Sequence, residues 1–131
     1  KMTLMKVLSF LVFLATFFSC GTTTEISSPE NANYSIENMN IVENGFEGNI
    51  VVEVYDNQMN PINDYQSVLT ENGKVIFDVP QKGHRCTFFK DGKSLTIEIK
   101  KEGYKTVKTK PFSTDDEMEL ANFIKITLEK E

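Results

Sequence analysis

Short apolar clusters separated by turn-forming residues constrain the fold of this chain more than any other feature. Between residues 34 and 129 these clusters are rich in Val, Ile, Phe and Thr, and Gly, Asn, Asp or Pro bound them. Such a composition is typical of β-strands joined by turns. Residues 49–55 alternate strictly, which places Ile50, Val52 and Val54 on one face that packs and leaves the other face to solvent. Helix signals are nearly absent, so the pattern predicts an all-β domain.

Further strands follow from the same pattern. We expect them before Leu69 and at residues 75–79, 84–89, 94–100, 103–107 and 121–129, and residues 34–42 can add an edge strand. Two alternating sets are expected to face inward: Leu95, Ile97 and Ile99, and Ile124, Ile126 and Leu128. About seven strands with a turn signal every ten residues predict an antiparallel two-sheet sandwich over residues 34–131, transthyretin-like or immunoglobulin-like in architecture.

The turn residues fix where these strands begin and end. Asp91-Gly92 is the strongest hairpin signal, because both central positions of a type I′ turn need positive φ. Glu71-Asn72-Gly73 forms an earlier turn. After it, Val75, Phe77 and Val79 are expected to point one way until Pro80 stops the strand. Residues 113–120 can hold one helical turn capped by a hydroxyl.

Part of this region resembles the carboxypeptidase regulatory-like domain, a transthyretin-like sandwich common in exported bacterial proteins. The resemblance covers residues 49–104. It is carried by Val52-Glu53-Val54-Tyr55-Asp56 with Pro61-Ile62, by the segment from Thr70 through Gly73 to Pro80, and by Gly103-Tyr104. It implies a non-catalytic accessory fold without a metal or cofactor.

The N-terminal segment predicts export and lipid anchoring. Lys6 precedes an apolar run at residues 7–18 that is too short to span a membrane, and Ser19-Cys20 follows it. This pattern resembles the lipobox of bacterial lipoproteins, in which the cysteine is acylated and the preceding residues, here 1–19, are removed. An ordinary secretory signal with an incidental Cys20 is the alternative. Residues 20–33 are polar and small, so we expect a flexible tether that holds the domain at the outer membrane, with its periplasmic side favoured.

The residues that commonly carry catalysis are scarce. The chain has one histidine, His84, and no spacing of Cys or His suited to zinc, so neither an enzyme nor a metal site is expected. A pair formed by His84 and Cys86 is conceivable if they share a face, but Cys86 is better interpreted as a core residue. The net charge of −5 argues against nucleic acid as a partner.

Basic residues concentrate in residues 82–110, where nine lysines and arginines stand against three acids. Such segregation predicts a basic binding face for an anionic partner, with Lys100, Lys101, Lys105 and Lys108 as its candidates. Alternatively, these lysines pair with glutamates on neighbouring strands.

The predicted function is that of an envelope-anchored, non-catalytic accessory, attached to the membrane through its lipid and binding another envelope protein. Exposed aromatic side chains would form the contact surface, and the candidates are Phe46, Tyr55, Phe88 and Phe89. A module that binds carbohydrate or an anionic ligand through residues 82–110 is the alternative, and the absence of tryptophan counts against carbohydrate.

Overall fold

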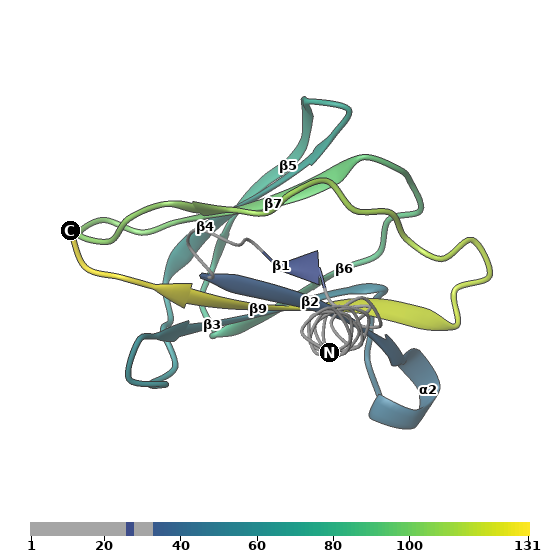
Figure 1. Ribbon diagram of the computed structural model, residues 1–131, viewed down its shortest axis with the longest axis horizontal. Helices are drawn as coiled ribbons and strands as arrows, with labels where there is room; N and C mark the ends of the chain where they lie inside the picture. The colour runs from purple at the N-terminus through teal and green to yellow at the C-terminus, as the bar shows by residue number, and fades with distance from the viewer. Residues whose placement is uncertain (1–25, 28–32) are drawn as a thin grey trace, which may run out of the picture.

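The computed structural model describes residues 26–27 and 33–131, so the predicted signal peptide, Cys20 and most of the predicted tether lie outside the described residues. The described residues form one short helix and nine strands, in this chain order (Figure 1): β1 Ile26–Ser27, β2 Tyr34–Asn40, α2 Ile41–Asn44, β3 Ile50–Asp56, β4 Tyr65–Glu71, β5 Lys74–Gln81, β6 Arg85–Phe88, β7 Leu95–Lys100, β8 Val107–Lys108 and β9 Leu120–Leu128. In the described part of the chain, no helix is both long and apolar enough to traverse a bilayer.

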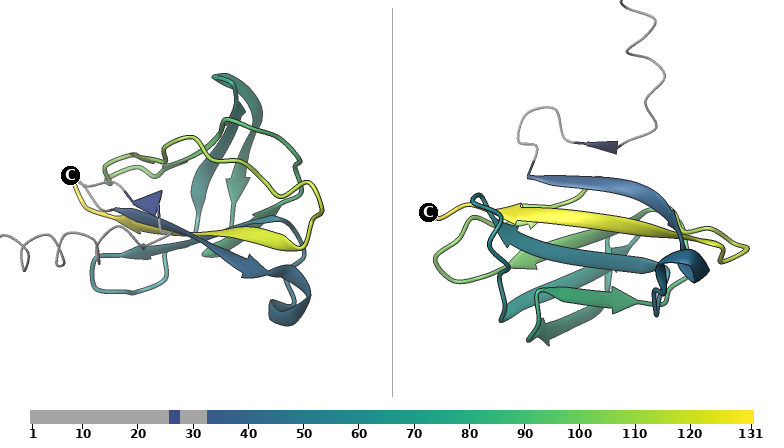
Figure 2. Two further views of the ribbon diagram at one scale, coloured as in Figure 1. Left: turned by 45° about the vertical axis from the view of Figure 1, so that its right-hand side comes forward. Right: turned by 90° about the horizontal axis from the view of Figure 1, so that it is seen from below.

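The strands form two sheets that pack face to face (Figures 1 and 2). Sheet A has the order β1-β2-β9-β3-β6 and sheet B the order β5-β4-β7-β8. The predicted β-sandwich is therefore confirmed, and seven of its strands have four or more residues. One pair departs from the antiparallel expectation, because β3 and β9 run parallel from Ile50↔Asn122 to Asp56↔Leu128.

Alternating side chains of the central strands form the core between the two sheets. The three predicted inward faces, on β3, β7 and β9, are confirmed, with every residue at most 1% exposed: Ile50, Val52, Val54, Leu95, Ile97, Ile99, Ile124, Ile126 and Leu128. Full burial of each such side chain stabilises the fold by about 1.5–3 kcal/mol. The buried faces of these strands thus follow directly from the period of two in the sequence.

The outer face of β3 is less open to solvent than its alternation predicts. Val51 is 0% and Glu53 is 7% exposed. Val51 lies beside Phe123 of β9 in the sheet register, and Phe46, just after α2, stacks on Phe123 with ring centroids 5.9 Å apart. A small second apolar cluster therefore covers this face of sheet A.

The predicted hairpin at Asp91-Gly92 is wrong. β6 pairs with β3 in sheet A while β7 pairs with β4 in sheet B, so this segment crosses from one sheet to the other. Gly92 does not have positive φ. Two side chains hold the crossing instead: Asn49 exchanges hydrogen bonds with the backbone of Lys90, and the Thr114 hydroxyl accepts one from the Gly92 amide.

The tight hairpin lies at Asn72-Gly73, between β4 and β5. Glu71 and Lys74 close it, and the two central residues have φ of 52° and 80°. Positive φ at both positions is the requirement of a type I′ turn, which Asn-Gly meets.

Strand β5 continues through Pro80 to Gln81, so the prediction that Pro80 stops the strand is wrong. A β-bulge interrupts its pairing with β4 at Leu69/Thr70. The bulge also separates the three residues predicted to share a face: Phe77 pairs with the core residue Leu69, whereas Val75 pairs with Thr70 on the opposite face.

Two terminal segments also differ from expectation. The predicted edge strand at residues 34–42 ends at Asn40, where α2 begins, and it lies between β1 and β9 rather than at the edge. Ile26–Ser27, within the predicted tether, forms β1. The predicted helical turn at residues 113–120 is a turn without a helix, and the cap is the carboxylate of Asp115, which accepts hydrogen bonds from the amides of Glu117, Glu119 and Leu120.

Candidate functional site

The four lysines of the predicted basic face lie around the β7–β8 end of sheet B, and each lies near or opposite an acidic or carbonyl group. Lys101 Nζ donates to the carbonyls of Asn63 and Asp64 at 3.0 and 2.7 Å. The ammonium groups of Lys100 and Lys105 lie 3.8 Å from carboxylate oxygens of Glu98 and Glu129, respectively. Lys108 lies opposite Glu98 in the strand register. These contacts favour pairing within the molecule, although only Lys108 and Glu98 lie opposite each other on neighbouring strands, and binding by these lysines stays a prediction.

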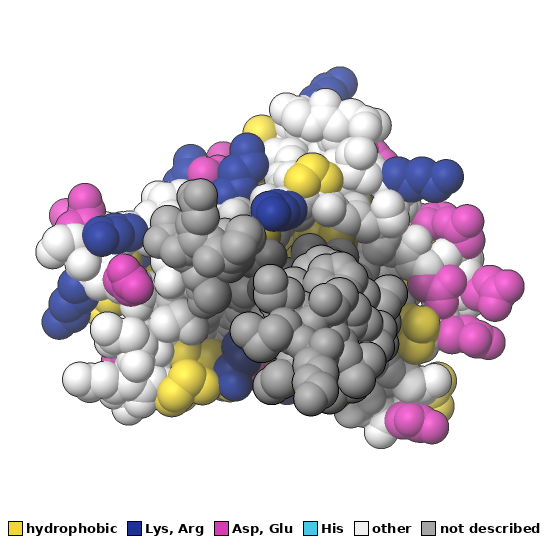
Figure 3. Space-filling view, viewed as in Figure 1, with side chains coloured by type: hydrophobic (Ala, Val, Ile, Leu, Met, Phe, Trp, Pro, Cys, Tyr) yellow, Lys and Arg dark blue, Asp and Glu magenta, His cyan; other side chains and the backbone are white. Residues whose placement is uncertain are grey.

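Charge is segregated over the molecule (Figure 3). In that view acidic side chains gather at the right-hand end, over the loop that leads into β9, while lysine and arginine side chains spread over the upper and left-hand parts. The acidic end contains Asp115, Asp116, Glu117 and Glu119. In this view acidic side chains are thus concentrated at one end, while basic side chains are spread over the rest with some acidic ones among them.

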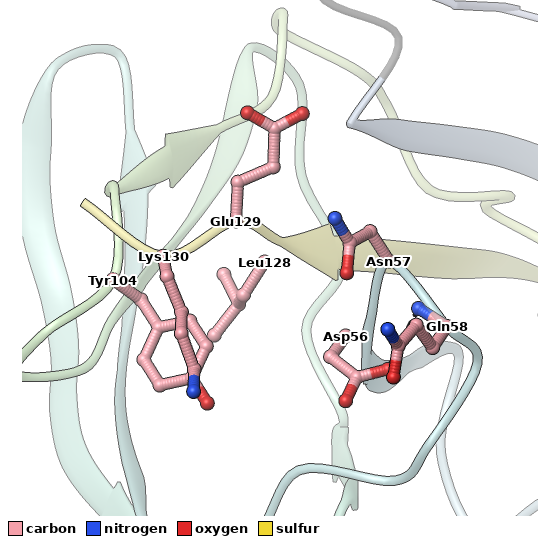
Figure 4. Close-up of a pocket in the computed structure, with 7 residues that line it drawn as sticks. All are labelled: Asp56, Asn57, Gln58, Tyr104, Leu128, Glu129 and Lys130. Carbon is pink, nitrogen blue, oxygen red and sulfur yellow. Dashed lines mark hydrogen bonds between the residues drawn. The ribbon is translucent and has the colours of Figure 1, made fainter.

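A hollow of about 500 Å³ opens beside the C-terminal end of β9 (Figure 4). Its lining is mainly polar: Asp56, Asn57, Gln58, Tyr104, Leu128, Glu129 and Lys130. The Asp56 carboxylate accepts hydrogen bonds from the amides of Gln58 and Asn60, which hold the pKa of Asp56 below its ordinary value. These contacts make the segment a self-contained turn, and the hollow assembles no acid–base pair.

Glu53 is the centre of the most connected polar cluster, on the outer face of sheet A. Arg85 Nε donates to Glu53 Oε2 at 2.8 Å, and the Tyr55 hydroxyl donates to Oε1 at 2.7 Å. Each cation beside Glu53 in the register also lies over an aromatic ring, Arg85 over Phe46 and Lys125 over Tyr55, at 5.6 and 5.3 Å from the ring centroids. Both carboxylate oxygens are thus occupied, which is the arrangement of a structural ion pair.

His84 and Cys86 do not form a pair. The His84 ring contacts Tyr55 edge-on at 5.6 Å between centroids, while Cys86 lies in the core. Burial raises the pKa of the Cys86 thiol, which keeps it protonated and unreactive. Nowhere in residues 26–27 and 33–131 do three or more His, Cys, Asp or Glu side chains gather as a metal ion requires.

An exposed apolar strand is the feature best suited to contact another molecule. Val75, Phe77 and Val79 of β5 are 55%, 41% and 38% exposed. Strand β5 forms the edge of sheet B, and the β4–β5 hairpin extends beyond the rest of the sandwich (Figures 1 and 2). We call Val75, Phe77 and Val79 the β5 stripe.

The stripe adjoins the core at the open side of the sandwich. Phe77 stacks on Phe88 of β6 with ring centroids 5.9 Å apart, and Ile76 packs partly against the core. Since β6 is the edge strand of sheet A, the two sheet edges meet here. Phe77 and Val79 of the stripe therefore continue the core between two sheet edges, while Val75 lies on the opposite face of sheet B.

The predicted aromatic contact residues divide into three groups. Phe89 is 63% exposed, Phe88 is buried, and Phe46 and Tyr55 are half-buried in the cluster around Glu53. The sequence interpretation missed the exposure of the β5 stripe. A proline inside the apolar run was the available signal, because proline within a sheet is found mainly on edge strands.

Comparisons with known proteins add no identification: no protein family, curated protein or solved structure matches the chain.

Proposed function

We propose that this chain is an envelope-anchored lipoprotein whose β-sandwich is a non-catalytic accessory module that binds another envelope protein. The observation that carries this proposal is the β5 stripe, three apolar side chains more than a third exposed on an edge strand. Exposed apolar groups on an edge strand favour association with another chain, and soluble proteins normally protect such strands.

The other surfaces give a catalytic role no support. The polar groups of the Glu53 cluster bond to one another, the thiol of Cys86 is buried, and the Asp56 carboxylate beside the hollow accepts hydrogen bonds from the backbone of its own turn. The resemblance to the carboxypeptidase regulatory-like domain also implies an accessory fold.

Contact through the stripe can be tested by photocrosslinking in cells. A photoreactive amino acid replaces Phe77, and the control places it at Val42, which is 86% exposed in α2. We expect a discrete crosslinked protein from position 77 that position 42 does not give. Equal or absent crosslinking at both positions would remove the stripe as a contact surface.

Anchoring is tested separately with Cys20→Ala. If Cys20 is acylated, wild-type cells incorporate a labelled fatty acid into the chain, and the alanine variant loses both the label and its membrane association. Retention of the label by the variant contradicts the lipoprotein proposal.

A second candidate function is the binding of an anionic ligand by the basic face. It is favoured by the exposure of two of its side chains, 53% for Lys100 and 62% for Lys105, which leaves their ammonium groups accessible despite their glutamate partners.

A further inference from the structure

We propose that β5 receives an extended segment of the partner protein, which adds to sheet B as a new edge strand and carries apolar side chains flanked by acidic ones. This inference rests on the proposed function, because it specifies the chemistry of the partner at the same surface. It differs from docking through side chains alone, since the backbone of β5 would take part.

The backbone of β5 offers one free side. Among the described residues, β5 pairs with β4 and with no other strand. Along an antiparallel strand, alternate residues direct their N–H and C=O groups to opposite sides, so about half of those in β5 point away from β4. An added strand would satisfy these groups, as in other complexes formed by strand addition.

The side chains of β5 give the added strand a preferred composition. Phe77 and Val79 point to the core face of the sheet, where their β4 partners are Leu69 and Ser67. Apolar residues at every second position of the added strand would lie beside these two side chains and cover them. The open side of the sandwich next to Phe88 would be covered at the same time.

The charges at the two ends of β5 favour acidic residues at the two ends of the added strand. Lys74 begins β5 and Lys82 directly follows it, and both are exposed. The one acid within β5, Asp78, accepts a hydrogen bond from Gln66 Nε2 at 2.7 Å. Acidic residues at both ends of a partner segment would therefore meet lysines.

The same charges disfavour a second copy of this chain as the occupant. Two β5 strands in full antiparallel overlap would bring Lys74 of one chain beside Lys82 of the other, and like charges oppose such pairing. Pro80, which lacks an N–H, and the bulge opposite Leu69/Thr70 further restrict open-ended pairing.

Synthetic peptides test the inference on the full chain in lipid nanodiscs. The first probe alternates valine and threonine over seven residues with a glutamate at each end, so that its nine residues match positions 74–82. The second has lysine at both ends. The third repeats the first with N-methyl groups on alternate amides, which removes the backbone donors along one side of the strand while keeping its charges. Fluorescence anisotropy gives the Kd of each, and amide hydrogen exchange locates the contact.

We expect the glutamate probe to bind and to slow exchange within residues 74–82. At a concentration nine times its Kd, exchange of an amide bonded only in the complex should slow about tenfold, since the factor is one plus the ratio of concentration to Kd. The lysine probe should bind roughly 2- to 25-fold more weakly, from two charge pairs of about 0.2–1 kcal/mol each. The N-methylated probe should give no protection.

Matched substitutions assign the effect to the stripe. Val79→Thr, alone or with Phe77→Thr, keeps strand propensity and removes apolar contact, and should weaken the glutamate probe, whereas Val42→Thr in α2 should not. Absence of protection in residues 74–82, or equal binding of the N-methylated probe, overturns strand addition. If position 77 still gives a crosslinked protein in cells when strand addition fails, the proposed accessory function stands. If the peptide binds but position 77 gives no crosslink in cells, strand addition at β5 stands and the proposed function is contradicted.

Discussion

Glu53 joins strands β3 and β6 on the outer face of sheet A through the hydrogen bonds of its carboxylate. The carboxylate is 7% exposed, and it receives hydrogen bonds from Arg85 on the neighbouring strand and from Tyr55 two residues along its own. Burial raises the pKa of Glu53, but the hydrogen bonds from Tyr55 and Arg85 together outweigh burial and hold the pKa below its ordinary value of 4.5. The ionised form is therefore the one that the fold stabilises.

Replacing this carboxylate tests the ion pair. We expect Glu53→Gln to lower the free energy of unfolding at pH 7 by about 1–3 kcal/mol, because the Arg85 guanidinium loses its charged acceptor. A group whose folded pKa is depressed contributes stability above its unfolded pKa, and this is lost as pH falls through the folded pKa. The deficit of the variant should therefore shrink below pH 4.5. Urea unfolding of the variant and the wild type at pH 7 and pH 3 measures the deficit in unfolding free energy at each pH. An equal deficit at the two pH values would contradict the stabilising role of the ionised carboxylate.

Gly48 is required for packing rather than for its φ. A Cβ at this position would overlap the carbonyl oxygen of Phe88, and backbone atoms cannot move aside as a flexible side chain can. Gly48→Ala should therefore destabilise the domain by about 1–3 kcal/mol. Gly83→Ala is the matched control, because its nearest atom is 4.0 Å away, and it should be neutral or stabilising by up to about 1 kcal/mol. Similar urea midpoints for the two variants would contradict the close approach.

At the scale of elements, two of the three Asx-Gly pairs of the chain lie between strands and have different structures. Asn72-Gly73 turns β4 into β5 with positive φ at both residues, while Asp91-Gly92 carries the chain between sheets. Gly73→Ala should lower the free energy of unfolding by about 1 kcal/mol or more, from the cost of left-handed φ. Gly92→Ala displaces only the Glu71 side chain and should cost less. Thermal unfolding of both variants measures these losses of stability. A larger loss for Gly92→Ala than for Gly73→Ala would support a tight turn at Asp91-Gly92 instead.

This comparison shows why strands were easier to predict than their connections. The inward faces of β3, β7 and β9 follow from alternation alone, since a period of two determines which side chains a packed sheet buries. An Asp-Gly pair between two strands is compatible both with a hairpin, in which the strands pair, and with a crossing, in which they lie in different sheets. In the folded chain, hydrogen bonds between residues distant in sequence hold Asp91-Gly92 as a crossing between the sheets: Asn49 bonds to Lys90, and Thr114 bonds to Gly92.

The candidate surface illustrates the same limit. Phe77 and Val79 have the composition and spacing of buried residues, and Pro80 directly after them is a local sign of an edge strand. Their exposure follows from the position of β5 at the end of sheet B, which depends on how four strands assemble. Among the aromatic residues predicted as contacts, Phe89 is exposed but Phe88 is buried in the core.

At the scale of the whole molecule, the charges of the sequence separate in space. The acidic loop before β9 and the basic β7–β8 region lie at different places on the sandwich (Figure 3). A domain with this arrangement has a directional electrostatic field, which orients its approach to a charged surface or partner. The question is whether the lysines act outward, on a ligand, or inward, on neighbouring carboxylates.

Neutralising Lys100, Lys101, Lys105 and Lys108 together answers this question. Substitution of all four by glutamine retains the length and polarity of the side chains and removes the charge. The intramolecular contacts predict a loss of only about 0.2–1 kcal/mol for each exposed pair, measured by urea unfolding, because such pairs are weak in water.

If the four lysines form a binding face for an anionic ligand, a different result is expected. Wild-type binding to vesicles containing anionic lipid would then fall steeply from low to physiological ionic strength, and the quadruple variant would bind weakly at every salt concentration. Glutamine at Lys74, Lys90, Lys93 and Lys125 provides a control with the same change in net charge at positions outside residues 100–108. Equal losses of vesicle binding in the two variants would attribute the effect to net charge, whereas a loss confined to the first would assign it to these four lysines. Unchanged binding in both would leave the lysines as partners of neighbouring carboxylates and carbonyls within the molecule.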